Sequence, residues 1–431
     1  MKSFFIKIKS FFHTIEDNIA FYPALLSFIG FNFAMLMLFL EDEGISAFVI
    51  EHVPELVINN ADTAKTLLSF LTGGIISIMV FSFSMVMVLL NQASSNFSPR
   101  VLPGLISKRN HQYVLGMYLA TILYNTFTLV GIDPLENDKY QLPGFSVLIG
   151  IILTVLCFFA FLYFIHSISQ SIQVNSILKS IYTKARNRLV MLVDKEREKA
   201  PSFPDTSDWK EYGSKETGYL QTFAAANLIN ICEEHDIQIK ILPIPGGFVL
   251  KEIPIVKISK EIEDDLVEEI LSNFNFAEGE IVDDNYALAF KQISEIGIKA
   301  MSPGINDPGT AINTIDYLTE LFAIRLQKHD DTIITNDDKS LIFVNTVNFS
   351  ELLYQVMVSY RTYCKHDMTC VQKLFLMIKY LLLQRTSNDN YHNSLIDEAK
   401  HLYDDAKANI GNEEDRRRIE QLYKSLPNKR D

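Results

Sequence analysis

Four long apolar stretches dominate the first part of the chain. They cover about residues 19–40, 66–90, 113–132 and 145–165, and none of them contains Asp, Glu, Lys or Arg. A helix needs roughly 20 apolar residues to cross the hydrocarbon core of a bilayer. Because four such stretches follow one another with polar loops between them, the pattern predicts a four-helix transmembrane domain over residues 1–168.

After residue 168, the apolar runs give way to amphipathic and alternating patterns. An apolar stripe that includes Ile177, Ile181 and Leu189 predicts a juxtamembrane helix over residues 169–200, continuous with the fourth span. A stretch with Pro and Gly at 201–218 is typical of a linker or surface loop. The elements predicted next are strands at 218–223 and 237–243, a hairpin at 245–258, and helices at 224–235 and 261–273. They form a small α/β unit over residues 201–280.

Residues 281–431 are predicted to form a helical domain. Its first helix has one apolar face, which carries Gly297 at a position where the missing side chain allows another helix to approach closely. Apolar residues continue through 341–384, and Lys373, Lys379 and Arg385 interrupt or border the run at 374–383. That run is therefore expected to be a buried core helix rather than a fifth span. Residues 392–422 predict a polar helical hairpin. The fold class is a membrane α-helical domain, then a cytosolic α/β domain, then a C-terminal helical region.

The string SPGINDP at residues 302–308 separates two predicted helices. Asp307 is a typical N-cap and Pro308 a typical first helical residue, so one interpretation is a sharp corner between helices. The other interpretation is a ligand site. Free N–H groups at a helix start suit an anion, whereas a carboxylate with carbonyl groups suits a cation. The ligand-binding candidates are Ser302, Gly304, Asn306, Asp307 and Thr310.

Two segments resemble a known family. They are ASSNFSPRVLPGL at residues 93–105 and ALAFKQISEIGIKAMSPGINDPGTAINTIDYL at residues 287–318. Both are similar to the bacterial family of predicted membrane proteins DUF2254, and the similarity extends over about residues 15–380. The resemblance implies an inner-membrane protein with several spans and a cytosolic domain. It implies no activity.

Lysine and arginine in the short loops predict the orientation of the spans. Positive residues precede the first span, follow the second and follow the fourth, whereas the other two loops are mainly acidic. The positive clusters are Lys2, Lys7 and Lys9, then Arg100, Lys108 and Arg109, then Lys179, Lys184, Arg186 and Arg188. Because cytoplasmic loops carry an excess of Lys and Arg, both termini and the second half of the chain are expected to be cytoplasmic.

The net charge of −13 belongs mainly to the second half of the chain. An acidic domain argues against nucleic acid as a partner, because phosphate binding requires basic patches. Cys157, Cys232, Cys364 and Cys370 show no spacing typical of zinc ligands. No cofactor or metal is therefore expected. The expected partners are the lipid bilayer and further copies of the chain, and a small ion or anion is a candidate ligand.

Polar residues recur within two of the spans. Ser77, Ser84 and Asn91 fall seven residues apart in the second span, and Thr121, Asn125 and Thr128 share one face of the third. One interpretation is helix packing, in which small and polar side chains join neighbouring helices. The other is a weakly polar stripe that lines a pore in an oligomer, and these six residues are the pore-lining candidates.

The chain lacks the sequence motifs of the common enzyme classes. It has no G-x-S-x-G, H-E-x-x-H, Walker A or Rossmann glycine motif, so no catalytic residue is assigned and no enzyme activity is expected. The leading hypothesis is an oligomeric channel or transport-like protein whose cytosolic domain gates it or senses a ligand. The alternatives are a non-conducting scaffold or sensor that binds a partner or small anion, and a membrane-tethered enzyme.

Overall fold

The computed structural model describes residues 20–46, 58, 60–96, 109–132, 143–171, 173–196, 203–277, 285–336 and 339–427. The chain divides into two compact units, Met1–Gln173 and Val174–Asp431. Most of the loop charges that predict the orientation, at residues 2–9, 51–55, 100–108 and 133–139, lie outside the described residues.

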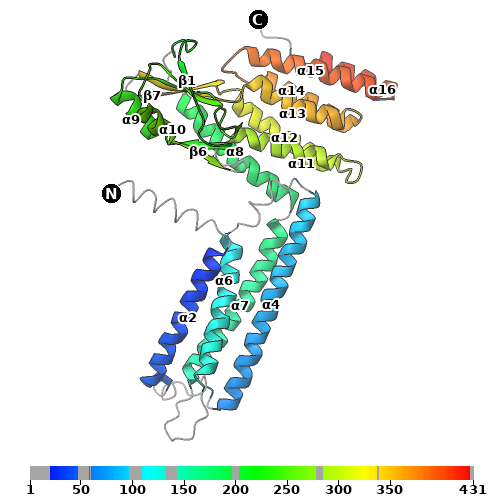
Figure 1. Ribbon diagram of the computed structural model, residues 1–431. Coiled ribbons are helices and arrows are strands. Elements are labelled where there is room, and N and C mark those ends of the chain that lie inside the picture. Colours follow the sequence, from blue (N-terminus) through cyan, green and yellow to red (C-terminus); the bar gives the residue numbers. More distant parts are fainter. Residues whose placement is uncertain are drawn as a thin grey trace. The chain divides into compact units, whose positions relative to one another are not determined.

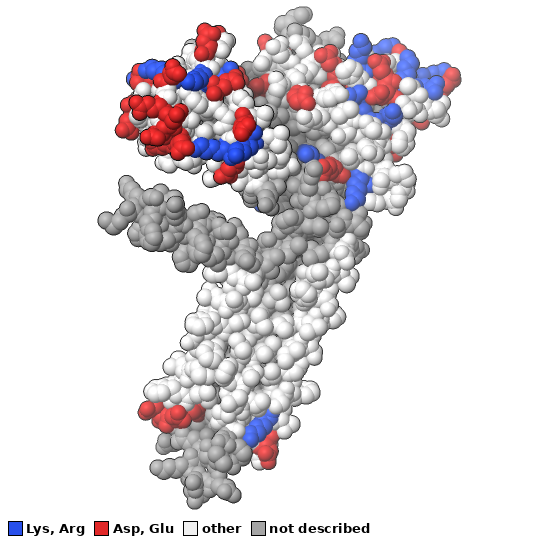
Figure 2. Space-filling model, viewed as in Figure 1, with Lys and Arg blue, Asp and Glu red and all other residues white. Residues whose placement is uncertain are grey.

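The first unit contains the four predicted spans as four helices (Figure 1). They are α2 (Phe21–Asp42), α4 (Ala61–Asn96), α6 (Arg109–Val130) and α7 (Gly144–Ser171). Large apolar side chains such as Phe28, Phe70 and Phe159 are 65%, 78% and 64% exposed on their outer surface, as expected of side chains that face lipid. Figure 2 shows charged residues on the visible face of these helices mainly at the end where α2 finishes and α4 begins. The prediction of four transmembrane helices is confirmed.

The helix α6 packs against α2, α4 and α7. Its contact with α2 is close, because a Cβ atom at Gly30 would lie 2.6 Å from the carbonyl oxygen of Ala120. Small residues permit this kind of backbone approach between membrane helices. The start of α7 is held from α2, since the Glu41 Oε1 atom accepts hydrogen bonds of 2.7 Å from both the amide and the hydroxyl of Ser146. A carboxylate at a helix N-terminus satisfies amides that lack an intrahelical partner.

The second unit contains two sheets. The five-stranded sheet has the order β1-β5-β3-β8-β7, and the three-stranded sheet has the order β4-β2-β6. Their bounds are β1 Lys210–Gly213, β2 Gly218–Phe223, β3 Ile239–Ile241, β4 Phe248–Val249, β5 Pro254–Ile258, β6 Phe274–Ala277, β7 Asp331–Asn336 and β8 Lys339–Asn345. Only the β3–β8 pair is parallel within the described strands, with Ile239 opposite Ile342. The predicted domain boundary between residues 280 and 281 therefore passes through one sheet.

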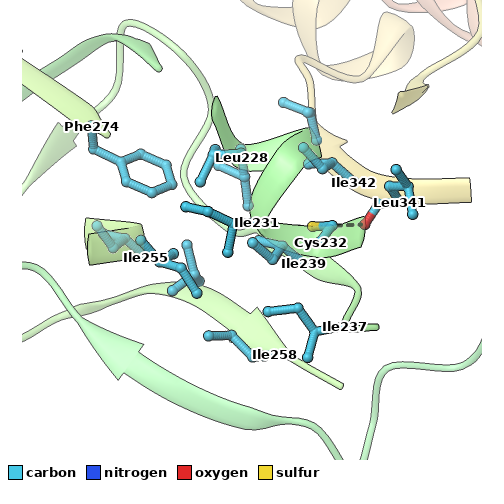
Figure 3. Packing of buried hydrophobic residues seen from close by; sticks show 14 of the residues in the cluster. Leu228, Ile231, Cys232, Ile237, Ile239, Ile255, Ile258, Phe274, Leu341 and Ile342 are labelled. Carbon is cyan, nitrogen blue, oxygen red and sulfur yellow. Dashed lines mark hydrogen bonds between the residues drawn. The ribbon is translucent and has the colours of Figure 1, made fainter. Parts of the chain in front are cut away.

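A hydrophobic core lies between the strands and two short helices, α9 (Ala225–Glu234) and α10 (Asp264–Leu271). Figure 3 shows Leu228 and Ile231 of α9 beside strand residues such as Ile239 and Ile342. The core residues of β3 follow the alternation expected of a strand, whereas β5 buries the consecutive residues Ile255 and Val256. Side chains from α9, β3, β5 and β8 thus make one continuous apolar interior.

Three local predictions were wrong. The stretch 245–258 is not a hairpin, because β4 and β5 belong to different sheets. Residues 210–213, expected in a linker, form β1, and the start of the predicted helical run at 341–384 forms the end of β8. Each error has one cause: strand partners distant in the sequence decide these segments, and local turn or periodicity signals do not report them.

The rest of the second unit is helical (Figure 1). Its helices are α8 (Val174–Glu196), α11 (Tyr286–Ala300), α12 (Pro308–Arg325), α13 (Phe349–Cys364), α14 (Met368–Leu382), α15 (Asn390–Asn409) and α16 (Glu413–Lys424). The predicted stripe Ile177, Ile181 and Leu189 is buried on α8, which packs against α11 and α12. The helix is not continuous with α7, which ends at Ser171. The apolar run at 374–383 lies mostly buried in α14, as predicted for a core helix.

Arg325, at the end of α12, connects helices and strands of the second unit. Its side chain is fully buried and donates to the carbonyl oxygens of Lys328 and Val347, both at 2.8 Å, and to the Asp330 carboxylate. The same carboxylate accepts a 2.8 Å bond from the backbone amide of Phe349 at the start of α13. A buried guanidinium is stable only with such partners, so this cluster fixes how α12, α13 and the β7–β8 hairpin meet.

We predict that Gly297→Ala destabilises the second unit by about 1–3 kcal/mol through overpacking. A methyl group at this position would collide with the hydroxyls of Tyr360 and Thr314, which are buried and 2.7 Å from each other. Urea unfolding in detergent micelles, followed by labelling of the buried Cys364 and Cys370 thiols, measures the loss. Gly304→Ala is the matched control, because a methyl group there meets nothing within 4 Å. Equal midpoints for the two variants would contradict the prediction.

Candidate functional site

The three polar candidates on α6 lie inside the four-helix unit. Thr121, Asn125 and Thr128 are at most 1% exposed. The Asn125 amide donates to the Thr154 hydroxyl of α7 at 3.4 Å, and the Cys157 thiol donates to the Thr121 hydroxyl at 3.3 Å. These residues therefore face α7 of the same chain, in the interior of the bundle.

The three polar candidates on α4 are placed differently. Ser77, Ser84 and Asn91 are exposed, so the helices of their own chain do not cover them. The Ser77 hydroxyl donates to the Gly73 carbonyl oxygen of its own helix at 2.9 Å, a common way to satisfy a hydroxyl in a membrane helix. The structure thus brings together the set on α6 and keeps the set on α4 apart from it.

Further buried polar residues extend the α6 set. Six buried residues of the four-helix unit each carry one polar atom that has no hydrogen-bond partner among the described residues. We call these residues the polar seam: Glu41, Ser82, Gln112, Tyr118, Asn125 and Thr128. Four of the six belong to α6. The Tyr118 and Ser82 hydroxyls face each other without meeting hydrogen-bond geometry. Buried polar groups therefore recur along α6, with an apolar interval of about 9 Å between Gln112 and Tyr118 that includes the buried Val114.

The two ends of the polar seam differ in chemistry. At one end, Glu41 binds Ser146 through Oε1, and the Tyr124 hydroxyl donates to the Ser146 carbonyl oxygen at 2.9 Å. At the other end, the His111 Nε2 atom lies 3.3 Å from the Ser167 hydroxyl. Each end thus carries an ionisable side chain that is less than 10% exposed.

The seam residues outside α6 were not predicted from the sequence. Glu41 was counted only as a loop charge, although the structure includes it in α2. Tyr118 shares the helical spacing of Thr121, Asn125 and Thr128, so this signal was present in the sequence. Ser82 has no comparable signal in the sequence, because only the fold shows that this face of α4 meets Tyr118 of α6.

The SPGINDP segment forms a tight corner between α11 and α12. The Ser302 carbonyl oxygen accepts the amides of Ile305 and Asn306 at 3.0 and 2.9 Å, and the Asp307 amide donates to the Ala300 carbonyl oxygen at 2.8 Å. Asn306 has a φ of 48°, in the left-handed region that Asn tolerates better than most residues. These contacts give Ser302 and Asn306 a structural role in the turn.

Both carboxylate oxygens of Asp307 are occupied by Thr310. Oδ1 accepts the Thr310 amide at 3.1 Å, and Oδ2 accepts the Thr310 hydroxyl at 2.6 Å. These hydrogen bonds hold the pKa of Asp307 below its usual range. A negative charge already lies at the start of α12, so the arrangement suits a capped corner better than an anion site. Gly304, in contrast, is exposed and has open space around it.

An ionic cluster in the second unit, with Arg361 and Glu398 largely buried, was also missed. Arg361 of α13 pairs with Asp405 at 2.9 Å and with Glu398 at 3.4 Å, and the His401 Nδ1 atom lies 3.3 Å from Glu398. Burial raises the pKa of Glu398. The cluster joins α13 to α15, and the separation of its members along the chain hides it from any local motif.

The chemistry of metal or thiol sites is not evident in the described part of the chain. No group of three His, Cys, Asp or Glu side chains there is placed to hold a metal ion. The four cysteines are free and buried, and burial raises the pKa of Cys232 to about 12. Their thiols therefore contribute mainly as small apolar groups.

Comparisons with known proteins agree with the membrane architecture. The model of a family described as predicted membrane proteins (DUF2254) matches residues 16–380. Uncharacterised proteins of Mycobacterium bovis and Mycobacterium tuberculosis are each 22% identical over 278 residues, which is 61% of this chain and 52% of theirs. The match thus spans about half the length of these relatives. No solved structure matches the chain.

We predict that Asp307→Ala lowers the free energy of unfolding by about 1 kcal/mol, the usual effect of losing an N-cap. Asp307→Asn keeps a capping oxygen and should lose less. Because the pKa of Asp307 is lowered in the folded state, the capping contribution is present above the unfolded pKa of about 4 and is lost as the pH falls through the folded pKa. Urea unfolding at pH 7 and pH 3 measures both effects. A phosphate-dependent thermal shift that disappears in Asp307→Ala would instead support a ligand site.

Proposed function

The chain belongs to the DUF2254 family of predicted membrane proteins, and we propose that it is a channel or transport-like protein. In this proposal the four-helix unit provides the path, and the second unit gates it or senses a ligand. The membrane location follows from the family and the four apolar helices. The transported species, the gating and the assembly are proposals.

The polar seam is the observation that carries this proposal. A helix bundle that serves only as an anchor has no need for buried polar groups, because each one left unpaired in an apolar medium is costly. Polar residues inside membrane proteins commonly mark routes for ions or protons. Three of the six pore-lining candidates, Thr121, Asn125 and Thr128, lie in this interior.

The proposed location is a bacterial inner membrane with both termini in the cytoplasm. The support is the distribution of Lys and Arg in the loop sequences, which places every positive cluster on one side. With this orientation, the second unit is cytosolic and can respond to intracellular ligands.

We also propose a homo-oligomer whose subunits meet through α4. A methyl group at Gly73 or Gly74 would meet nothing within 4 Å, and Ser69 and Ser77 lie one turn away on the same face as Gly73. Small residues four apart allow two membrane helices to approach closely. In such an assembly the exposed Ser84 and Asn91 would extend the same contact.

Ion flux into liposomes that contain the purified protein tests the function. We expect flux of at least one small ion at one voltage polarity, and we expect Asn125→Leu to reduce it about tenfold, which is about 1.4 kcal/mol in barrier height. The triple variant Ser77→Leu, Ser84→Leu, Asn91→Leu should change the oligomeric state and leave the flux per chain nearly unchanged.

The reverse pattern, in which only the triple variant blocks flux, would move the path from the interior of each chain to an axis between copies. Absence of flux for every small ion at both polarities, at rest and under osmotic tension, would overturn the channel proposal.

A non-conducting scaffold or sensor is the second candidate. The observation that favours it is the exposed tip of the SPGINDP corner. Ile305 is 40% exposed there, and a Cβ atom at Gly304 would meet nothing within 4 Å, so packing within the chain does not require a glycine at this position. A partner protein or small anion that packs closely on this tip would account for both residues. A membrane-tethered enzyme is the third candidate, and no described residue is assigned a catalytic role.

A further inference from the structure

The polar seam extends over most of the thickness of a membrane. At ~1.5 Å per residue, α6 rises about 24 Å between Gln112 and Thr128. The hydrocarbon core of a bilayer is about 30 Å thick. The seam and the ionisable groups at its ends therefore lie at depths that together span the bilayer.

The unpaired atoms of the seam are deeply buried. Glu41 Oε2, Ser82 Oγ, Gln112 Oε1, Tyr118 Oη, Asn125 Oδ1 and Thr128 Oγ1 have no hydrogen-bond partner among the described residues, and their side chains are at most 4% exposed. Folded proteins leave few buried polar atoms unpaired, and bound water satisfies many of those that lack a protein partner. The Tyr118 hydroxyl faces Ser82, and the Thr128 hydroxyl lies beside Tyr124, so rotation of these hydroxyls can pair part of the set. The acceptors Glu41 Oε2, Gln112 Oε1 and Asn125 Oδ1 are the atoms that bound water would satisfy.

Paired polar groups lie between the unpaired ones. The Thr121 hydroxyl is positioned between Tyr118 and Asn125 on α6, and the Thr154 hydroxyl of α7 accepts from Asn125 at 3.4 Å. Along α6, Asn125 and Thr128 differ by about 4.5 Å in height, a step that one bridging water covers. Side chains and single waters can thus connect Tyr118 to Thr128, and the longer step of about 9 Å between Gln112 and Tyr118 requires more than one water.

We propose that this interior conducts protons between Glu41 at one end and His111 at the other, with water held by the polar seam. This inference rests on the proposed transport function and names its substrate. A proton arriving from water binds one end, a series of hydrogen-bonded groups each passes one proton onward, and an equal proton leaves at the other end. No group gains or loses a proton over the full cycle.

Close packing favours protons over larger ions. A Cβ atom at Gly150 would lie 2.6 Å from the Asn125 Oδ1 atom, so the helices leave little space at this level. Between Gln112 and Thr128 the described seam residues carry no charge that could replace the hydration shell of a metal ion. Hydrogen-bonded side chains and single waters can pass a proton through such packing, whereas a hydrated ion requires the helices to separate.

Two conservative variants and a matched control test the proposal in proteoliposomes. Tyr118→Phe and Thr128→Val each remove one hydroxyl that lies outside hydrogen-bond geometry, although Ser82 and Tyr124 are their neighbours, and both keep the shape of the side chain, so both should fold. Thr126→Val is the control, because Thr126 is exposed on the same helix and its hydroxyl donates to the Ile122 carbonyl oxygen. Collapse of a pH gradient is followed with a trapped fluorescent dye, and valinomycin with potassium compensates the charge.

We expect the wild-type protein to collapse the gradient, Tyr118→Phe and Thr128→Val to slow the collapse about tenfold, and Thr126→Val to change it less than about twofold.

X-ray hydroxyl-radical labelling in water enriched in oxygen-18 provides a second measurement, since Tyr118 should be oxidised if water lies beside it. Potassium or chloride flux without proton flux would overturn the proton path and leave the proposed transport function standing. Absence of flux for every ion would overturn both, and an unlabelled Tyr118 would overturn the hydrated interior.

Discussion

A polar group that is removed from water must find a partner within the protein, and this constraint shapes both units of the chain. In the first unit, the amide at the start of α7 is satisfied by Glu41, a residue from the end of α2. In the second unit, the buried Arg325 donates to Asp330 and to two backbone carbonyl groups, those of Lys328 and Val347. The Glu41 and Val347 contacts join elements that are separate along the chain. They therefore fix how helices and strands meet, a property that apolar packing alone specifies less strictly because it is not directional.

Both units hold buried polar atoms without a partner among the described residues, and the surroundings of those atoms differ. The Arg325 Nε atom is one of them, but both Nη atoms of the same guanidinium donate to oxygen atoms, so the side chain still joins the segments around it. Along α6, in contrast, the hydroxyls of Tyr118 and Thr128 and the amide oxygen of Asn125 lack partners among the described residues, although a bilayer offers no compensating water from outside. The cost of such an arrangement is hard to explain by stability. The proposed transport function gives these groups a use, and it places that use in the four-helix unit rather than at the corner of the second unit.

Much of the fold could be predicted because local physics decides it. The four spans follow from length and apolar character, the corner follows from the Asp307 cap and Pro308, and the close contact at Gly297 follows from its place on an apolar face. The sheets could not be predicted in the same way. The strand β8 pairs in parallel with β3, which lies about a hundred residues earlier in the chain. The strand β4 pairs with β2 and not with β5, the strand that follows it in the sequence. Turn and periodicity signals describe a segment and its immediate neighbours, and they carry no information about such partners.

The pore-lining candidates also show what local sequence patterns cannot predict, namely which polar face of a membrane helix is buried. Helical spacing groups Thr121, Asn125 and Thr128 on one face, and it groups Ser77, Ser84 and Asn91 equally well. The structure buries the first group and exposes the second. In a membrane both directions are apolar, so hydrophobic periodicity does not separate an inward face from a lipid-facing one. What separates them is hydrogen bonding: Ser77 satisfies its hydroxyl within its own helix, whereas Asn125 reaches across to Thr154 and keeps an acceptor free. The proposed path through the bundle therefore rests on the free acceptors rather than on the polar residues as such.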